Sequence, residues 1–387
     1  MKLDLVFGAD NLHYPLTGIG RYAYELASRL ESDERISRVR YFSLGRWIAD
    51  PLTQCMKPSG PAPRQPWDVV RARLANNRLA ASAYTTLAPK YFQWALRKLD
   101  NKTIFHAPNF FVLPSQAIKV VTVHDLSHEQ SPEFHPTARS LLMSAMLPES
   151  LRRADHVVTV SEAVRKELIS RHQVHADRVT AVHLAASDMY RPHTHEMLAS
   201  TMTELGLQRG AYSLFVGTVE PRKNLERLVQ AYASLPEEMR RACPLVVAGG
   251  QGWNSESAHA RMAKAQAQGW LRYMSFVDQR LLPALYAGAR LMAYPSLYEG
   301  FGLPIVEAMA SGTPVLTSNT SCMPEVAGGA AYLVNPRDVD DICHGLEHCL
   351  SDEAWQADAR AKGLARAAQL SWDRCASETI AVYQQLA

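Results

Sequence analysis

The sequence lacks any uninterrupted run of about 18 apolar residues, the length that a membrane-spanning helix needs. Its first residues, Met1 to Asp4, lead directly into a strand-like pattern and not into the apolar core of a signal peptide. Cysteine is scarce, and the six cysteines never show CxxC spacing, so we expect reduced thiols, with no disulfide framework and no metal site. These absences predict a cytoplasmic protein.

A strong net charge is also missing. Lys and Arg number 41 and Asp and Glu 38, which gives a net charge of +3 and argues against nucleic acid as a partner. The charge is nevertheless uneven, because residues 60–102 combine basic side chains with interleaved aromatic ones. The basic residues there are Arg64, Arg71, Arg73, Arg78, Lys90, Arg97, Lys98 and Lys102. This mixture suits either peripheral contact with an anionic membrane, at its inner face, or a solvated helical face whose aromatic rings turn into the core.

The chain contains no internal repeat and no low-complexity tract. Its 387 residues exceed the size at which a single core usually stops growing, roughly 250 residues, so two domains are expected. Short apolar runs alternate with helical patterns throughout, which predicts an α/β fold with parallel sheets covered by helices. The expected strands are residues 3–7, 103–106, 120–123, 157–160 and 179–183, and then 213–216, 245–248, 274–277, 291–294, 315–317 and 331–334. Between the two groups the sequence becomes polar, which places a domain boundary near residue 190.

The most informative segment is S-L-Y-E-G-F-G-L-P-I-V-E-A-M-A-S-G-T-P-V at residues 296–315. A glycine-containing turn follows a strand here, and a helix is expected to begin near Leu303 with Pro304 in its first turn. The unpaired amides and positive dipole of a helix start suit a diphosphate when no metal is bound. Glu299 and Glu307 are too far apart for an acid–base pair, so we assign Glu299 to the transferred sugar and Glu307 to a ribose.

This segment resembles the signature E-x7-E of the retaining glycosyltransferases of family 4, which have the GT-B fold. The segments V-V-T-V-H-D-L at residues 120–126 and G-T-V-E-P-R-K-N at residues 217–224 extend the resemblance along nearly the whole chain. The E-P-R-K-N and E-G-F-G-L-P forms are most similar to mannosyl- and rhamnosyltransferases of bacterial polysaccharide assembly, which commonly use GDP-sugars.

The resemblance implies two Rossmann-like domains that face one another across a cleft. Residues 1–190 would form the acceptor-side domain and residues 191–370 the domain that binds the nucleotide-sugar donor. The C-terminal helix, residues 371–387, would pack back on the first domain.

Two cations are indicated by the chemistry as well as by the resemblance. Departure of a nucleoside diphosphate builds up negative charge, which Arg222 and Lys223 would stabilise most in the transition state. The alternative is a pair of surface cations at a helix start, an unfavourable position unless an anion is bound there. Many family members carry an arginine where this chain has Thr218, and whether Arg222 replaces it stays open.

In the first half, His124 and Asp125 follow an expected strand. The resemblance makes His124 a contact to the donor sugar, and a hydrogen-bonded histidine at a strand end is the alternative. His106, at the end of the preceding strand, is a weaker candidate. Gly18 and Gly20 match a G-x-G-x-x-A pattern, but the long segment before them argues against NAD, and the resemblance places them at a helix start near the donor phosphates.

Together these patterns predict a metal-independent retaining transferase without a cofactor. It would move mannose, or a 6-deoxyhexose such as rhamnose, from a GDP-sugar to a lipid-linked or oligosaccharide acceptor in O-antigen or exopolysaccharide synthesis. Alternatives are a nucleotide-sugar epimerase, a phosphorylase, another GT-B enzyme that uses a UDP-sugar, or a silent sugar-nucleotide binding protein. The expected catalytic residues are His124, Lys223 and Glu299, and the expected donor-binding residues are Gly18, Gly20, Asp125, Arg222, Val277, Phe301, Gly302, Leu303 and Glu307.

Overall fold

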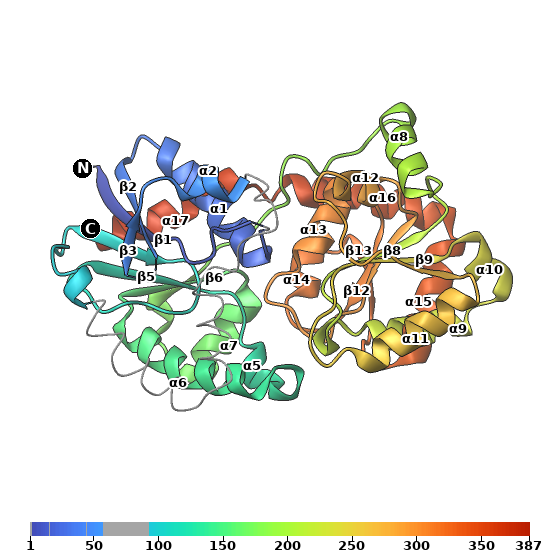
Figure 1. Ribbon diagram of the computed structural model, residues 1–387, viewed down its shortest axis with the longest axis horizontal. Helices are drawn as coiled ribbons and strands as arrows, with labels where there is room; N and C mark the ends of the chain where they lie inside the picture. Colours follow the sequence, from blue (N-terminus) through green and yellow to red (C-terminus); the bar gives the residue numbers. More distant parts are fainter. Residues whose placement is uncertain (1, 15, 44, 57–92) are drawn as a thin grey trace. The chain divides into compact units, whose positions relative to one another are not determined.

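The computed structural model describes residues 2–14, 16–43, 45–56 and 93–387, apart from the side chains of residues 138 and 139. These residues form two compact units (Figure 1). The first unit comprises Met1–Leu184 together with Trp372–Ala387, and the second comprises Ala185–Ser371. The first unit therefore takes its last helix from the far end of the chain.

The first unit is built on a seven-stranded sheet of order β3-β2-β1-β4-β5-β6-β7. All neighbouring strands are parallel except β2 and β3, which form an antiparallel edge. Figure 1 shows α1, α2 and α17 on one face of this sheet and α6 and α7 on the other. The elements are β1 (Leu3–Gly8), α1 (Gly18–Ser32), β2 (Ile36–Ser43), β3 (Arg46–Ile48), α2 (Pro51–Met56), β4 (Thr103–Ala107), β5 (Ile118–Val123), α5 (Ser127–Gln130), η1 (Pro132–Phe134), α6 (Thr137–Arg153), β6 (His156–Thr159), α7 (Glu162–His172), η2 (Ala176–Arg178), β7 (Val179–Ala181) and α17 (Trp372–Leu386).

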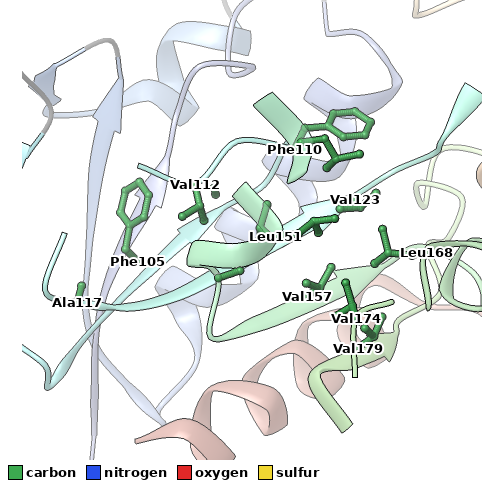
Figure 2. Close-up of a cluster of buried hydrophobic side chains, with 14 of the residues drawn as sticks. Phe105, Phe110, Val112, Ala117, Val123, Leu151, Val157, Leu168, Val174 and Val179 are labelled. Atoms are coloured by element: carbon green, nitrogen blue, oxygen red, sulfur yellow. The ribbon is translucent and has the colours of Figure 1, made fainter. Parts of the chain in front are cut away.

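The central strands of this sheet are apolar because helices cover both of their faces. In β5, the last four residues are all buried. Side chains that point to one face, among them Val121, Val123 and Val157, pack against Leu147 and Leu168 of the covering helices. Figure 2 shows part of this cluster, with Leu151 and Leu168 lying over the strands. The apolar runs of the sequence therefore form the interior strands of a sheet between two helical layers.

The second unit repeats the same plan with a six-stranded parallel sheet of order β10-β9-β8-β11-β12-β13. In Figure 1, α12, α13 and α16 lie on one face and α9, α11 and α15 on the other. The elements are α8 (His195–Leu205), β8 (Ser213–Val216), η3 (Pro221–Lys223), α9 (Leu225–Ser234), α10 (Glu237–Ala242), β9 (Leu245–Ala248), α11 (Glu256–Ala267), β10 (Leu271–Tyr273), α12 (Leu282–Ala287), β11 (Leu291–Tyr294), α13 (Leu303–Ala310), β12 (Val315–Ser318), α14 (Met323–Ala327), β13 (Ala331–Val334), α15 (Val339–Ser351) and α16 (Glu353–Ala368).

One expected strand is wrong. The sequence predicts a strand at residues 274–277, whereas β10 ends at Tyr273. Ser275 adopts a left-handed backbone with φ of 48°, which ends the extended run, and Phe276 is 65% exposed. The Ser275 carbonyl still accepts a hydrogen bond from the Gly249 amide at 2.7 Å, so the chain stays beside β9 without continuing the ladder.

Two helix starts have residues that favour a helix N-terminus. Ser161 is the N-cap of α7 and accepts a hydrogen bond from the Val164 amide. The helix α13 begins at Leu303 with Pro304 in its first turn, and Gly302 before it has a left-handed φ of 90°. The helix in the E-x7-E segment therefore begins where the glycine and proline predict.

Most of the basic and aromatic segment at residues 60–102 lies outside the described residues. Of its described part, Trp94 is 60% exposed, and the Arg97 guanidinium lies 4.4 Å from the centre of its ring. Within the described part of the chain, none of the helices is both long and apolar enough to cross a bilayer. The six cysteines, all of them described, are free thiols.

Candidate active site

The two loops that carry the expected catalytic residues of the second unit leave neighbouring strands. β8 and β11 pair directly although β9 and β10 lie between them in the chain. Ligands of doubly wound sheets bind beyond the carboxyl ends of the strands at such a reversal of strand order. The loop after β8 carries Arg222 and Lys223 on the short helix η3, and the loop after β11 carries Glu299. The topology thus brings together residues that are more than seventy positions apart in sequence.

Glu299 is at the centre of this cluster. The Lys223 Nζ donates a hydrogen bond to its Oε1 at 2.7 Å, and the Arg222 Nη1 donates to its Oε2 at 2.7 Å. The Tyr294 hydroxyl donates to Oε1 at 2.9 Å. Glu299 is only 5% exposed, so both of its oxygens are engaged in a largely dry environment.

Each cation has a second partner. The Arg222 Nη2 donates to Glu220 Oε1 at 2.7 Å, and Lys223 Nζ lies 2.6 Å from the Tyr294 hydroxyl. Two cations and two carboxylates therefore compensate one another. Burying such groups is expensive, and apolar residues of similar volume would often be as stable. Paired charges beyond the strand ends are therefore better explained by binding of a charged ligand than by stability.

The pKa values follow from the same geometry. Burial alone would raise the pKa of Glu299, but Arg222 and Lys223 outweigh it and lower the pKa to about 2. Burial, together with repulsion by Arg222, lowers the pKa of Lys223 even though Glu299 opposes the shift. The carboxylate is therefore charged over the whole physiological pH range, and the amine releases its proton more readily than an exposed lysine.

The loop after β8 is held by the Asn224 side chain and by a backbone contact with the loop after β9. Asn224, in the left-handed region with φ of 59°, donates through its side-chain amide to the carbonyls of Pro295 and Pro336 at 2.9 and 2.6 Å. A Cβ atom on Gly249 would lie 1.9 Å from the Gly217 carbonyl oxygen, so the loops after β8 and β9 touch backbone to backbone. Gly249, the first residue of the G-G-Q-G turn at residues 249–252, is thus required for the packing of the loop that carries the two cations.

The start of α13 completes the candidate phosphate site. Gly302, the N-cap of α13, has no side chain that could cap this helix start. Amides at a helix N-terminus without a capping side chain attract anions. Phe301 beside it is only 4% exposed, whereas Leu303 is half-buried.

Comparisons with known proteins show the family of the chain. The sequence profile described as Glycosyltransferase Family 4 matches residues 16–186, and the profile described as Glycosyl transferases group 1 matches residues 204–368. The chain is 38% identical over 384 residues to O-antigen chain mannosyltransferase B of Escherichia coli, covering 99% of this chain and 100% of that protein. The chain belongs to family 4 of the glycosyltransferases.

More distant relatives support the fold of this family 4 enzyme. A serotype-specific mannosyltransferase of Escherichia coli is 31% identical over 294 residues, which cover 73% of this chain and 36% of that protein. The structure of a sucrose-phosphate synthase from Thermosynechococcus elongatus superposes with a TM-score of 0.69 at 20% identity, covering 100% of this chain and 99% of the other. The two sheets are accordingly the Rossmann-like domains of a GT-B fold.

The remaining residues that the sequence analysis relates to the donor lie on α13, after β10 and after β8. Glu307, on α13, is half-buried, and its Oε2 accepts a hydrogen bond from the Tyr286 hydroxyl at 2.8 Å. Val277 is half-buried in the segment after β10. Thr218 is exposed, whereas Arg222 is enclosed between Glu220 and Glu299. The assignment of Glu307 to the ribose and that of Val277 to donor binding stay predictions.

In the first unit, His124 directly follows β5 and is 7% exposed. Its Nε2 lies 2.8 Å from the Pro108 carbonyl, which can only accept, so Nε2 carries a proton. Burial lowers the pKa of His124, more than this hydrogen bond and Asp125 raise it, which favours the neutral ring. The ring contacts Tyr22 edge to face, with centroids 4.9 Å apart. His124 is thus a hydrogen-bonded histidine at a strand end, and in the neutral ring its Nδ1 remains an acceptor.

The other first-unit candidates are held by local contacts. Asp125 Oδ1 accepts from the amide and the hydroxyl of Ser127 at 3.0 and 2.7 Å. Gly18 is exposed in the first turn of α1, and a Cβ on Gly20 would lie 2.8 Å from the Asn11 carbonyl oxygen. Because β1 ends at Gly8, the tight strand-to-helix turn of a dinucleotide site is absent from these described residues.

Sequence reasoning missed three contributors to the cluster. Tyr294 joins Lys223 to Glu299, and Glu220 is the second partner of Arg222. Ser321 holds the Glu299 backbone, because its hydroxyl donates to the Glu299 carbonyl at 2.6 Å. Tyr294 ends a strand just before the segment at residues 296–315, and this position could have indicated that it belongs to the site. Nothing in the sequence relates Ser321 to Glu299.

Proposed function

We propose that this glycosyltransferase transfers a hexose, mannose or a 6-deoxyhexose such as rhamnose, from a GDP-sugar to a saccharide acceptor with retention of anomeric configuration. The observation that carries the proposal is the buried set of Arg222, Lys223 and Glu299 next to the start of α13. The acceptor would be a growing O-antigen or exopolysaccharide chain, which a lipid carrier and peripheral contact with an anionic membrane would suit.

The charge balance of the cluster supports binding of a diphosphate. Glu299 forms ion pairs with both cations, with N–O distances of 2.7 Å to each. A diphosphate brings further negative charge, so we infer that its oxygens take over Arg222 and Lys223 while Glu299 accepts hydroxyls of the transferred sugar. In the transition state the leaving phosphate gains charge, and cations held rigidly stabilise it most at that point. A divalent ion is not required in this scheme.

The first unit supports a role for His124 as an acceptor of a hydrogen bond. Because the Nε2 proton is used by Pro108, the ring presents Nδ1 to a donor, and a sugar hydroxyl is such a donor. Its contribution would be orientation of the sugar. The proton of the acceptor hydroxyl would pass to the leaving phosphate oxygen, since we assign no protein nucleophile.

The names of the relatives guide the choice of sugar. One relative along the whole chain is an O-antigen chain mannosyltransferase, and a further one over 64% of this chain is O-antigen chain mannosyltransferase RfbU of Salmonella typhimurium. Mannose from GDP-mannose is therefore the first donor to test. A UDP-sugar is the alternative donor.

The experiment is a panel of GDP-, UDP- and dTDP-sugars incubated with the protein, with release of nucleotide measured with and without a chelator. We expect GDP-mannose or a related GDP-6-deoxyhexose to react, the chelator to change the rate less than twofold, and Glu299→Ala to remove the activity. The anomeric configuration of the product, read by NMR, tests retention. Turnover of UDP-sugars alone would reject the donor, and a strict need for a divalent ion would reject the electrostatic scheme.

A further inference from the structure

Four buried polar side chains form a continuous hydrogen-bonded network in the first unit, and the proposed reaction uses none of them. The network extends from Tyr383 on α17 through His106 on β4 and Thr122 on β5 to Tyr22 on α1. His106, Thr122 and Tyr383 have no exposed surface, and Tyr22 is 1% exposed. Such a network requires every partner to be present, because a buried hydroxyl or ring nitrogen without a partner is costly.

Each hydrogen bond of the network joins a specific pair of atoms. His106 Nδ1 bonds to the Tyr383 hydroxyl, and its Nε2 lies 2.8 Å from Thr122 Oγ1. Thr122 Oγ1 also lies 2.8 Å from the Tyr22 hydroxyl. Burial, with His124 nearby, lowers the pKa of His106 to about 3, so its ring is neutral and has one donor and one acceptor nitrogen. Both nitrogens therefore have suitable partners in the two hydroxyls.

Tyr22, the last residue of the hydrogen-bonded network, contacts His124. Thr122 and His124 are two positions apart at the end of β5, so their side chains leave on the same face of the sheet. Tyr22 spans both, with its hydroxyl on Thr122 and its ring edge to face with His124 at 4.9 Å and an interplanar angle of 81°. Phe110 contacts the imidazole as well, with centroids 6.1 Å apart, and Pro108 fixes Nε2. The Tyr22 ring is thus one of three groups that contact the imidazole.

We propose that Tyr22 is a positioning residue for His124, and that the hydroxyl of Thr122, oriented by His106 and Tyr383, holds Tyr22 in place. This inference rests on the proposed contact between His124 and the transferred hexose. It also gives α17 a role in the reaction, because the helix that follows the second unit in the chain supplies Tyr383 to the first. A displacement of about 1 Å in a reacting group can reduce a rate a hundredfold, so partial loss of orientation should be visible in kcat.

The test compares three substitutions in the full-length protein, with the nucleotide sugar of the panel that reacts fastest. Tyr22→Phe removes the hydroxyl and keeps the ring, Thr122→Val removes the shared hydroxyl, and Thr122→Ser restores it. We expect Tyr22→Phe and Thr122→Val to lower kcat roughly tenfold with the KM of the donor changed less than twofold, and Thr122→Ser to recover most of kcat.

Tyr41→Phe is the matched control. Tyr41 is 4% exposed in the same unit. Its hydroxyl donates a hydrogen bond to Glu31 at 2.7 Å, outside the hydrogen-bonded network. Its substitution should lower the melting temperature about as much as Tyr22→Phe and leave kcat unchanged. If Tyr22→Phe and Thr122→Val behave like Tyr41→Phe, the hydrogen-bonded network contributes only to stability and the inference is overturned.

A double-mutant cycle with His124→Asn separates the inference from the proposed function. If Tyr22 acts through His124, Tyr22→Phe should have no further effect on kcat once His124 is replaced. An equal loss in both backgrounds would overturn the inference while leaving the role of His124 intact. An unchanged kcat in His124→Asn alone would contradict the proposed role of His124, and the inference with it.

Discussion

The second unit holds its polar groups beyond the sheet as paired charges, whereas the first unit holds them as neutral hydroxyls and imidazoles. Arg222 and Lys223 share Glu299, while His106 lies between Thr122 and Tyr383. Both sets lie near the carboxyl ends of strands in sheets with related strand order. Under the proposed function, the paired charges of the second unit would exchange partners with a ligand, whereas the neutral network of the first unit would fix an orientation.

The largest expected effect is that of removing the shared carboxylate. Glu299→Ala leaves two buried cations beside one another, so we expect kcat to fall by at least about a thousandfold and the unfolding free energy to fall by about 3–5 kcal/mol. Nucleotide release and urea unfolding measure the two quantities. Glu299→Gln keeps the shape without the charge, and a kcat near that of the wild type in this variant would remove the distinction between the two units.

Loss of one cation should be the next largest effect. Lys223→Met should lower kcat about a hundredfold, because the leaving phosphate loses one charged partner while Glu299 keeps Arg222. Lys264→Met, on the exposed surface of α11, is the matched control and should leave kcat unchanged. Similar rates for both variants would show that the leaving phosphate is stabilised elsewhere.

The backbone contact beneath the charged cluster predicts a smaller effect. Gly249→Ala places a Cβ against the Gly217 carbonyl and requires an alanine at φ of 156°, so the unfolding free energy should fall by about 2–4 kcal/mol. Gly250→Ala meets no described atom within 4 Å and should change it by less than about 0.5 kcal/mol. Thermal unfolding of the two variants checks this, and equal melting temperatures would contradict the packing of these loops.

The pH dependence of stability should separate the two units. The folded pKa of His106 lies below its ordinary value of 6.5, so unfolding takes up a proton and the first unit loses stability as the pH falls from 6.5 toward about 3. Glu299 acts in the same direction but later, as the pH falls from 4.5 toward about 2. Between pH 7 and pH 5 the loss due to His106 should be roughly 1–2 kcal/mol.

The measurement is urea unfolding of wild type, His106→Gln and Glu299→Gln at pH 7, 5 and 3.5. His106→Gln should be less sensitive than the wild type between pH 7 and 5, and Glu299→Gln should differ from the wild type only below that range. An identical slope for all three proteins would mean that neither group titrates differently in the folded state.

Much of the fold could be predicted because apolar runs and glycine signals act locally. The strands at 213–216, 245–248, 291–294 and 331–334 are observed with those bounds. The predicted strand at 274–277 failed because one left-handed residue, Ser275, turns the chain after Tyr273, and serine gives no warning of it. Hydrophobic periodicity indicates which residues are buried, but not where a single backbone angle ends a strand.

The candidate site was predictable only in part. Its charged members stand in recognisable motifs, since E-P-R-K-N and E-x7-E place Arg222, Lys223 and Glu299 in the loops after strands. Their partners are less apparent. Tyr294 lies outside both motifs, and Glu220 is the first residue of E-P-R-K-N but gives no sign that it pairs with Arg222. Only the folded chain relates these residues, as it relates Tyr383 to His106, 277 positions away.

The sequence by itself determined the alternation of strands and helices, the two domains and the residues with charges to offer, because these follow from local pattern and composition. The tertiary structure decided which charges meet and which histidine is neutral, because both depend on burial and on the order in which strands pair. β8 and β11 are neighbours through long-range pairing, and that pairing alone puts Glu299 between Arg222 and Lys223.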